Sequence, residues 1–511
     1  MSSDVQLVVP MTGVGQRFIN AGFENLKPLI KTEVGTMIEN VLQGFQSIRS
    51  PICILSKTAR DKVGLINEIR RIRPHAQIVE IPPHKKGPSY AVWVAREYIN
   101  LETPVIVSYC DFSGIWSESD FLNEIHLSDG LIQTYTGFHP HMIRSSRFAY
   151  VKKNAKEEVV DIQEKGSYTT NPMAEEASSG TYGFKSGQLL IDAINSQIHD
   201  EISLNGEFYT SLTYKPLITQ NKEIRTISME RFFQWGTPED LKDFNFWARL
   251  SLGVLPSSVG TKKSNAIVLA AGRGSRVAAM AQIEKPFINV FGKPMWSYTA
   301  SLFQDCDEKI FFTTEGNVEK FTQNDTFGFN CIVRSKETSS QAESASYALQ
   351  YVQKRDSPVH ILACDNLFLG KELANLEIML ADVDVIAWVT CDYAPSKHQK
   401  NQYSWVKVAS DGKISKLSVK DGNPDSSARL LIGNFSFRSA AIAKKLIDEM
   451  LKIKSDLAQE AYLDWVIDIA LKNGQRVSAI EVGEFWAVGT PSEFKTLQYW
   501  SEVFTKDRVK R

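Results

Sequence analysis

The chain has 511 residues, which is too long for a single hydrophobic core and predicts two or more domains. Its 58 lysines and arginines balance 59 aspartates and glutamates, which excludes a protein that gathers nucleic acid or an anionic membrane through its overall charge. The N-terminus lacks the basic start and apolar run of a signal peptide, and no stretch is apolar enough to cross a membrane, so we expect a soluble, cytoplasmic protein.

Short apolar runs alternate with amphipathic segments over the N-terminal part of the chain. The apolar runs predict buried strands at residues 5–10, 51–55, 76–81 and 105–109. The amphipathic segments predict helices at residues 36–45, 61–71 and 90–98. Strands that alternate with helices are typical of an α/β fold, in which helices cover both faces of a mostly parallel sheet.

The first strand leads into a glycine-rich turn, and the same combination returns in the second half of the chain. PMTGVGQRF at residues 10–18 is followed by a Lys-Pro pair at 27–28, and LAAGRGSR at residues 269–276 is followed by a Lys-Pro pair at 285–286. The copies stand 259 residues apart at the first glycine (272 minus 13) and 258 apart at the lysine (285 minus 27). We therefore expect whole domains to be repeated.

The correspondence continues far downstream. In each half a predicted buried strand ends in a Cys-Asp pair, at residues 110–111 and 364–365. The two aspartates, Asp111 and Asp365, lie 254 residues apart (365 minus 111). Gly180 and Gly433 lie 253 apart (433 minus 180), as do the Gly-Thr-Pro triplets that begin at residues 236 and 489 (489 minus 236). A register kept over this length predicts a duplicated domain.

The segment between the copies is rich in glycine, serine, proline and lysine, which is typical of a linker. We predict one domain at residues 1–253, a linker at 254–263 and a second domain at 264–511.

The glycine turn predicts a phosphate site. Backbone N–H groups without neighbouring Cβ atoms let an anion approach closely, and each copy adds an arginine and a lysine. The turn lacks the Gly-Lys-Ser/Thr ending of a P-loop, and Phe18 and Val277 replace the third glycine of a dinucleotide-binding turn. The alternative is an ordinary strand-to-helix connection with solvated charges, which the repetition disfavours.

Asp111 and Asp365 stand at the carboxyl ends of predicted buried strands, where open α/β sheets bind ligands. A single carboxylate can hold Mg²⁺ when phosphate oxygens supply further ligands, although an aspartate there can also cap the next element. No general base is evident. None is required, because a phosphomonoester is already an anionic nucleophile at neutral pH and catalysis can rest on positioning and charge neutralisation.

These motifs resemble those of the sugar-1-phosphate nucleotidyltransferases, also called nucleoside-diphosphate-sugar pyrophosphorylases. The second copy is close to the family's glycine turn and Lys-Pro pair, the first copy is looser, and the resemblance covers nearly the whole chain. It implies two consecutive Rossmann-like (GT-A-like) domains. It also implies the reaction, in which a sugar phosphate attacks the α-phosphate of an NTP and pyrophosphate leaves with the help of Mg²⁺.

The resemblance carries roles over to matching residues. Nucleotide binding would fall to Gly13, Gly15, Gly87, Gly272 and Gly274. Charge neutralisation at the reacting phosphates would fall to Arg17, Lys27, Arg276 and Lys285, and metal binding to Asp111 and Asp365. The sugar side would be bound by Glu164, Lys165, Gly180, Lys420 and Gly433.

The chain departs from the family pattern in each copy. A second metal-binding aspartate usually lies two residues before the late Gly-Thr, where this chain has Gln234 and Ala487. The second copy also has Val419 in place of Glu164, and its loop at residues 339–344 contains no glycine.

The leading interpretation is nucleotidyl transfer from an NTP to a sugar phosphate or similar phosphomonoester, giving an activated precursor for surface polysaccharide or glycoconjugate synthesis. Both domains can be active, or one can be active and the other regulatory. The alternatives are a non-catalytic nucleotide-binding sensor or scaffold, and a glycosyltransferase, which the absence of Asp-x-Asp after Asp111 and Asp365 disfavours. The expected partners are small molecules, with no nucleic acid and no membrane, and homo-oligomer formation stays open.

Two further groups of residues gave structural expectations. The six cysteines show no CxxC spacing and predict buried free thiols. His139 and His141 predict a polar loop more readily than a metal site, because no further ligand has suitable spacing.

Overall fold

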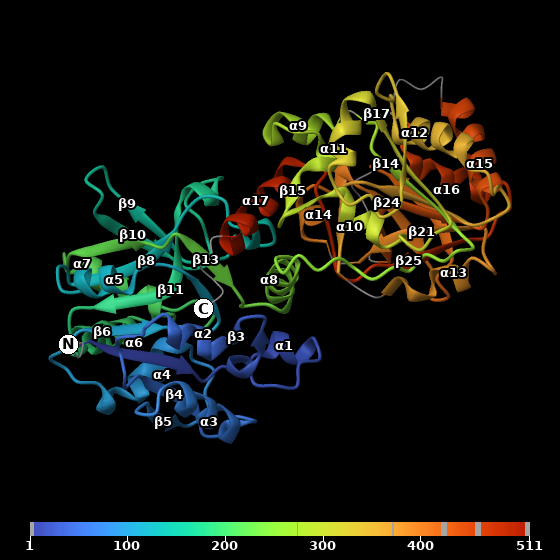
Figure 1. Ribbon diagram of the computed structural model, residues 1–511. Helices are drawn as coiled ribbons and strands as arrows, with labels where there is room; N and C mark the ends of the chain where they lie inside the picture. Colours follow the sequence, from blue (N-terminus) through green and yellow to red (C-terminus); the bar gives the residue numbers. More distant parts are fainter. Residues whose placement is uncertain are drawn as a thin grey trace. The chain divides into compact units, whose positions relative to one another are not determined.

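The chain folds into two compact α/β units, one reaching to Ala248 and the other running from Arg249 to Thr505 (Figure 1). The structure, a computed structural model, describes residues 5–272, 274–369, 372–391, 393–420, 427–454 and 461–505. The expected α/β fold class is confirmed for both halves. The domain limits at residues 253 and 264 remain a prediction.

The first unit contains a nine-stranded sheet, two small two-stranded sheets and flanking helices. The large sheet consists of β1 (Gln6–Met11), β4 (Ile52–Ser56), β5 (Gln77–Ile81), β6 (Val105–Ser108), β8 (Gly130–Tyr135), β9 (Tyr150–Lys153), β10 (Val159–Gln163), β11 (Glu176–Phe184) and β12 (Ile224–Ser228). The small sheets are β2 (Lys31–Thr32) with β3 (Gly35–Thr36) and β7 (Phe112–Ile115) with β13 (Arg231–Gln234). The helices are α1 (Gln16–Asn20), α2 (Met37–Gln43), α3 (Lys62–Ile72), α4 (Pro88–Val94), α5 (Glu118–Glu124), α6 (Gly187–His199), α7 (Tyr214–Thr219) and α8 (Pro238–Leu250).

The second unit likewise contains a nine-stranded sheet, two two-stranded sheets and flanking helices. Its large sheet consists of β14 (Asn265–Leu269), β17 (Glu308–Thr314), β18 (Asn330–Arg334), β19 (Val359–Ala363), β21 (Val385–Thr390), β22 (Ser404–Val408), β23 (Ile414–Val419), β24 (Ala428–Phe437) and β25 (Val477–Glu481). Its small sheets are β15 (Asn289–Val290) with β16 (Lys293–Pro294) and β20 (Asn366–Phe368) with β26 (Phe485–Ala487). The helices are α9 (Ser275–Ala281), α10 (Trp296–Ser301), α11 (Val318–Thr322), α12 (Gln341–Ala348), α13 (Leu376–Met379), α14 (Ala394–His398), α15 (Ala440–Lys454), α16 (Val466–Lys472) and α17 (Pro491–Thr505).

The two large sheets share one topology. In the first unit the strand order is β10-β9-β11-β6-β1-β4-β5, and in the second it is β23-β22-β24-β19-β14-β17-β18 over the corresponding strands. The strands β6, β1, β4 and β5 are parallel to one another, as are β19, β14, β17 and β18. The parallel region and the duplication are confirmed, and the antiparallel strands β11 and β24 make each sheet mixed.

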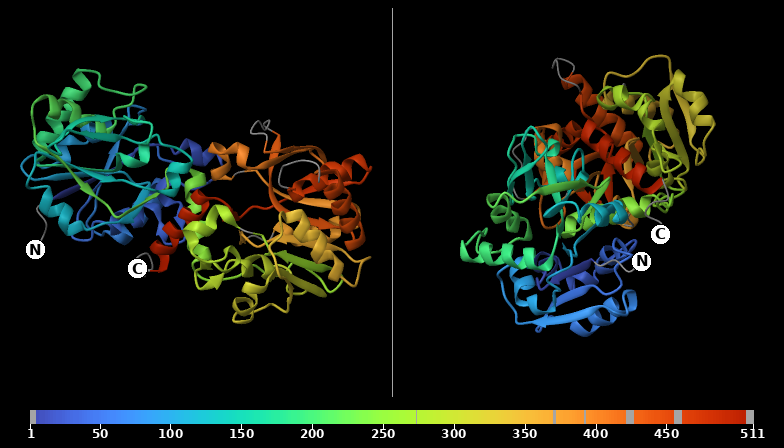
Figure 2. Two further views of the ribbon diagram at one scale, coloured as in Figure 1. Left: turned by 90° about the horizontal axis from the view of Figure 1, so that it is seen from above. Right: turned by 90° about the vertical axis from the view of Figure 1, so that its left-hand side faces the viewer.

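Both faces of the first sheet are buried, as expected for a parallel α/β sheet. Along β1, Val8 belongs to one hydrophobic cluster together with residues of α4, α6 and α7, while Leu7 and Val9 belong to a second cluster with residues of α2, α3 and α5. Side chains alternate across a strand, so these neighbours pack on opposite faces. Helices surround the sheet in each unit (Figure 2).

Local signals placed several helices well. Thr36 accepts a hydrogen bond from the backbone N–H of Glu39, and the Glu39 side chain accepts one in return, so a capping box begins α2. The predicted helix at 90–98 begins two residues early, at Pro88, and ends as a 3-10 turn over Arg96–Tyr98. The proline lies in the first turn, where its missing N–H costs nothing.

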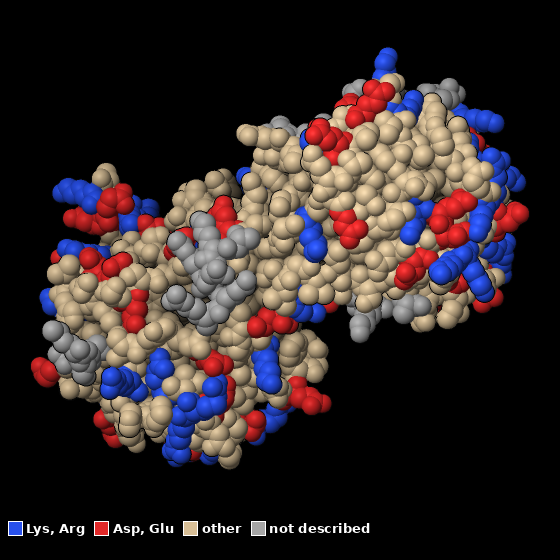
Figure 3. All heavy atoms as spheres, in the orientation of Figure 1, with Lys and Arg blue, Asp and Glu red and all other residues tan. Residues whose placement is uncertain are grey.

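The burial of the cysteines and of two histidines differs from what the sequence predicts. The six cysteines are free thiols, but only Cys53, Cys306 and Cys364 are buried as expected. Cys110 and Cys331 are partly buried, and Cys391, directly after β21, is exposed. His139 and His141 do not lie in a polar loop: both are buried in an aromatic cluster against Tyr135. No helix in the described ranges is long and apolar enough to span a membrane. Basic and acidic side chains intermingle on the face in Figure 3.

Candidate functional site

The glycine turn follows the central strand of each unit and has the same geometry twice. Gly15 and Gly274 adopt left-handed backbone angles, with φ of 67° and 57°. A Cβ atom added to them would lie 3.1 Å from Cβ of Lys27 and 3.3 Å from Cβ of Lys285. The second glycine of each turn is therefore required both by its backbone angle and by the close approach of the lysine.

The first glycine of each turn differs from the second. A Cβ added to Gly13 or Gly272 would meet nothing within 4 Å, and neither residue needs a left-handed angle. The fold itself therefore does not require glycine at these two positions. Open space beside exposed backbone is what an incoming phosphate needs.

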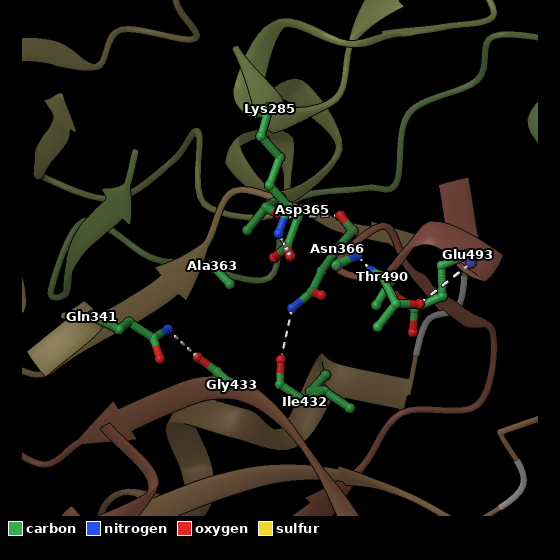
Figure 4. Close-up of polar contacts among 12 residues, drawn as sticks. Lys285, Gln341, Ala363, Asp365, Asn366, Ile432, Gly433, Thr490 and Glu493 are labelled. Carbon is green, nitrogen blue, oxygen red and sulfur yellow. Dashed lines mark hydrogen bonds and ion pairs between the residues drawn. The ribbon is translucent and has the colours of Figure 1, made fainter. Parts of the chain in front are cut away.

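The Lys-Pro lysine reaches the strand-end aspartate in both units. Nζ of Lys27 donates to Oδ2 of Asp111 at 2.6 Å, and Lys285 makes the same ion pair with Asp365 (Figure 4). Burial alone would raise the pKa of the Asp365 carboxyl, but Lys285 and Arg276 outweigh it and hold that pKa below its ordinary value. The pair joins residues 84 apart in the first unit and 80 apart in the second.

A cavity of about 580 Å³ opens beside this pair in the second unit. All seven residues predicted for the second copy line it: Gly272, Gly274, Arg276, Lys285, Asp365, Lys420 and Gly433. Its volume is within the range of small-molecule sites. The residues come from five separate segments of the chain, which the sheet topology brings to one edge.

One wall of the cavity is held by side-chain amides (Figure 4). Gln341, at the start of α12, donates to the carbonyl of Gly433 at 3.0 Å. Asn366 donates to the carbonyl of Ile432 at 2.9 Å and to the side chain of Asn434 at 3.1 Å. Gly433 has φ of 78°, and these hydrogen bonds hold the carbonyls of Ile432 and Gly433 in place along the wall.

A lysine in a left-handed conformation recurs on the predicted sugar side. Lys165 has φ of 58° and Lys420 has φ of 50°, and both follow the edge strand of the hairpin, β10 or β23. Nζ of Lys165 lies 4.3 Å from the ring centre of Tyr209, and Nζ of Lys420 lies 3.6 Å from that of Tyr462. Non-glycine residues avoid this backbone region, and its repetition favours a functional reason for the strain.

In the first unit this lysine lies beside a buried carboxylate. Ser211 donates to Oε2 of Glu164 at 2.5 Å, and Lys165 donates to the hydroxyl of Tyr209. Burial raises the pKa of Glu164, and the nearby Glu207 adds to this effect, while Ser211 and Lys165 oppose it. Arg17 lies close enough to act on the pKa of Tyr209, which links the glycine turn to the same group of residues.

Gly87 and Gly180 also have packing reasons to be glycine. Gly87 has φ of 85°, and an added Cβ would lie 2.7 Å from the carbonyl oxygen of Phe208. Gly180 has φ of 98°, and its added Cβ would lie 3.0 Å from the ring of Tyr109. The contact with Phe208 brings Gly87 to the segment that carries Tyr209, whereas Gly180 packs on Tyr109. Neither contact tests a role in binding.

The late Gly-Thr-Pro triplet is a helix start. In the second unit the buried carboxylate of Glu493 accepts the backbone N–H groups of Gly489 and Thr490 at 2.7 and 2.8 Å, and the hydroxyls of Tyr393 and Tyr403 at 2.6 and 2.8 Å. In the first unit Asp240 holds the corresponding position (493 minus 240 is 253). Burial raises the pKa of Glu493 despite its four donors.

The residues that replace the family's second aspartate lie next to the first. Gln234 pairs with Phe112 across β13 and β7, and Ala487 pairs with Asn366 across β26 and β20. Each is thus opposite the residue that follows Asp111 or Asp365. The first unit offers an amide at this place and the second a methyl group.

The residues present fit a magnesium ion that arrives with a phosphate chain. Among the described residues no group of three or more His, Cys, Asp or Glu side chains could hold a metal by itself. One strand-end carboxylate per unit remains, which suffices where phosphate oxygens and water complete the coordination. Asp111 and Asp365 are the residues that would hold the ion.

Sequence reasoning did not identify several side chains of the site. Tyr209, Tyr462 and Glu493 carry a signal, because they or their counterparts repeat at an offset of 253 (462 minus 209). Gln341 and Asp464 carry none, since Pro88 and Ser211 stand in the other copy at that offset (341 minus 88, 464 minus 211).

Two family models match the chain, one in each half. Residues 8–215 match the nucleotidyl transferase family and residues 266–398 match the MobA-like NTP transferase domain. No sequence among the curated proteins matches significantly.

Solved structures similar to this chain each cover about one half of it. A nucleoside-diphosphate-sugar pyrophosphorylase from Vibrio cholerae RC9 is 19% identical, with 47% of this chain and 98% of that chain covered and a TM-score of 0.39. A presumed glucose-1-phosphate thymidylyltransferase from Bacillus anthracis, in complex with a sucrose, is 15% identical, with 48% and 95% covered and a TM-score of 0.39.

Proposed function

Because the chain carries two nucleotidyltransferase domains in tandem, we propose that it transfers a nucleotidyl group from an NTP to a sugar phosphate or similar phosphomonoester. A phosphate oxygen of the acceptor attacks the α-phosphorus, the bond between the α-phosphorus and its bridging oxygen to the β-phosphate breaks, and pyrophosphate leaves. The product is an NDP-activated compound, which we assign to surface polysaccharide or glycoconjugate synthesis. The cytoplasmic location expected from the N-terminal sequence belongs to the same proposal.

The observation that carries the proposal is the cavity of the second unit. It is lined by the arginine and lysine that accompany the glycine turn, by the strand-end aspartate and by the lysine of the predicted sugar side, which are Arg276, Lys285, Asp365 and Lys420. Gly272 and Gly274 present backbone N–H groups to the triphosphate. Arg276 and Lys285 neutralise the charge that shifts toward the β-phosphate when the bond breaks. Fixed charges in a partly closed cavity act on this change without having to reorganise.

Lys285 has a specific task in this scheme. Without substrate Lys285 is paired with Asp365, so its ammonium group is held in the cavity lining instead of extending into solvent. A phosphate chain offers this group additional acceptor oxygens at the same place. Mg²⁺ would add positive charge there, held by Asp365 and the phosphates.

The acceptor phosphate would bind beside Lys420, which also lines the cavity. Lys420 supplies the cation there, and its place over the ring of Tyr462 fixes its direction. No proton acceptor is needed for the attack, because the acceptor phosphate is anionic at neutral pH. Positioning of the two phosphates and neutralisation of their charges therefore carry the catalysis.

The first unit supports the same chemistry with a different balance of residues. It has the Lys27–Asp111 pair and the left-handed Lys165, together with Glu164, which the second unit lacks. We propose that both domains are active. The methyl group of Ala487, where the first unit has Gln234, motivates the alternative that the second domain binds nucleotide without turnover and regulates the first.

The test is pyrophosphate release by the full chain with CTP, UTP, GTP and dTTP, each with a panel of sugar 1-phosphates and other phosphomonoesters. We expect Asp365→Asn to reduce release with one acceptor by about a hundredfold, since one charge that acts on the reacting phosphates is lost. Asp111→Asn should do the same with the acceptor of the first domain.

The variants also separate the alternatives. If one variant abolishes all release and the other has no effect, a single domain is the enzyme. Nucleotide binding without release for every acceptor would contradict the transferase proposal and favour the sensor. Asp325→Asn, in an exposed loop of the second unit, is the matched control and should change nothing.

A further inference from the structure

Three carboxylates line the cavity of the second unit, and two of them are already occupied. Asp365 is paired with Lys285, and Glu493 accepts four hydrogen bonds from backbone and tyrosine donors. The third is Asp464, in the 3-10 turn Leu463–Trp465. It receives no backbone N–H donor from the residues that the structure describes, and Ser404 and Lys420 are the polar groups that act on its carboxyl.

Asp464 occupies a position that the duplication makes informative. Its counterpart in the first unit is Ser211 (464 minus 211 is 253), which donates to Glu164. The counterpart of Glu164 is Val419, because Lys165 and Lys420 follow them and lie 255 apart (420 minus 165). The two partners of one hydrogen bond have therefore both changed: Glu with Ser in the first unit, Val with Asp in the second.

The exchange keeps one carboxylate at this place in each unit. The strand β10 packs against the turn that carries Ser211, and β23 packs against the turn that carries Asp464, so the same two elements meet in both units. In the first unit the carboxylate comes from the strand and in the second from the turn. A simple loss of function would remove the carboxylate without replacing it.

The surroundings of Asp464 indicate what it binds. The carboxyl of Asp464 is partly exposed at the cavity. Burial raises its pKa, while Ser404 and Lys420 oppose this effect, and a ligand in the cavity can add donors to it. Lys420 lies beside it and is itself suited to a phosphate. A phosphate bound at Lys420 repels the nearby carboxylate, because both are negatively charged. Hydroxyl groups on the same ligand, a few ångströms from its phosphate, can instead donate hydrogen bonds to this carboxylate.

We propose that Asp464 binds hydroxyl groups of a polyhydroxylated phosphomonoester, such as a sugar phosphate, and so selects the acceptor of the second domain. This inference rests on the proposed function, because it takes the lysine side of the cavity as the acceptor side. It adds that the second domain has kept a polyol site by exchanging residues. The carboxylate is presented from a different element and on a shorter side chain, so the two domains prefer different acceptors.

The test is calorimetric binding of glucose, galactose and mannose 1-phosphates to the full chain, with ethyl phosphate as the probe without hydroxyls. A Glu164→Gln/Lys165→Ala background removes the acceptor side of the first domain. Asp464→Ser should weaken the tightest sugar phosphate about tenfold or more, through the loss of hydrogen bonds to a charged group, and leave ethyl phosphate within about twofold.

The rescue variant makes the test specific. Val419→Glu combined with Asp464→Ser rebuilds the arrangement of the first unit, and it should bring sugar phosphate affinity back to within about threefold of the parent. NTP binding by each variant controls for folding.

The outcomes separate this inference from the proposed function. Unchanged sugar phosphate affinity in Asp464→Ser overturns the inference, as does equally tight binding of ethyl phosphate, or no binding of any probe, by the parent. Pyrophosphate release with an acceptor that lacks hydroxyls would then leave the proposed function intact. Sugar phosphate binding that depends on Asp464 without any pyrophosphate release would contradict the proposed function and leave the inference standing.

Discussion

At the scale of single residues, the two glycines of each turn have different work. Gly274 has a left-handed φ and touches Lys285, whereas Gly272 has neither constraint and faces open space at the cavity. The motif thus combines one glycine that the fold requires with one that a bound phosphate would require. Substitution separates the two demands.

We predict that Gly274→Ala lowers the free energy of unfolding by about 1–2 kcal/mol, because alanine is strained in the left-handed region. Gly272→Ala should leave that free energy within about 0.5 kcal/mol but weaken NTP binding about tenfold, because its methyl group occupies the space that phosphate would use. Urea unfolding and NTP titration measure the two effects. Equal loss of stability in both variants would contradict this division.

At the scale of elements, the helix start after the second Gly-Thr-Pro triplet connects the cavity of the second unit to its last helix. Glu493 caps α17 and at the same time receives two tyrosine hydroxyls from residues that line the cavity. Glu493 is only 1% exposed, so water could not take over its hydrogen bonds if its side chain were changed. The cap therefore holds the cavity wall as well as the helix.

Glu493→Gln is predicted to destabilise the second unit by about 1–3 kcal/mol, because one carboxylate oxygen becomes an N–H₂ group that faces donors. Lys495→Gln, on the exposed side of the same helix, is the control and should have no measurable effect. Hydrogen exchange of the backbone amides of α17 measures this loss of stability. A variant as well protected as the control would mean that the cap is not needed.

At the scale of the whole molecule, buried histidines make both units sensitive to acid. Burial lowers the pKa of His139 to about 4 and lowers those of His141 and His360, so these rings are neutral in the folded state. The unfolded chain binds their protons below about pH 6.5. Stability is therefore present above that pH and is lost as the pH falls from about 6.5 toward 4.

We predict that the melting temperature falls steadily between pH 6.5 and 4.5, and that His139→Gln flattens this fall. The contribution of His139 amounts to about 3 kcal/mol once the pH is below its folded pKa. His199, whose side chain is 87% exposed, is the matched control, and His199→Gln should keep the parent's pH profile. An identical profile for both variants would exclude His139 as a cause.

Much of the fold and part of the site could be predicted from local patterns. The strand β1, its glycine turn and the strand-end aspartate are short-range signals, and the rules for parallel sheets bring Lys27 and Asp111 to one edge although 84 residues separate them. The antiparallel strand β11 could not be predicted, because its pairing with β6 is set by the whole sheet rather than by its own pattern.

The remaining site residues depend on contacts that one copy alone does not reveal. Asp464 has a serine as its counterpart, so only the hydrogen bond between Ser211 and Glu164 shows that the two positions meet. Cys391 was expected to be buried with the other cysteines, but it lies in the bend directly after β21 and is exposed. Local sequence patterns predict helices and strands, whereas contacts between side chains far apart in the sequence become visible only in the folded structure.

The central claim is that the chain joins a nucleotide to a phosphorylated acceptor. The most direct measurement is ³¹P NMR of the full chain with Mg²⁺, the NTP and the acceptor that release most pyrophosphate. We predict a new diphosphate ester and free pyrophosphate in equal amounts, with both lost in a Lys27→Ala/Lys285→Ala variant. Pyrophosphate with only NMP beside it, or an unchanged NTP spectrum with every acceptor, would contradict the account.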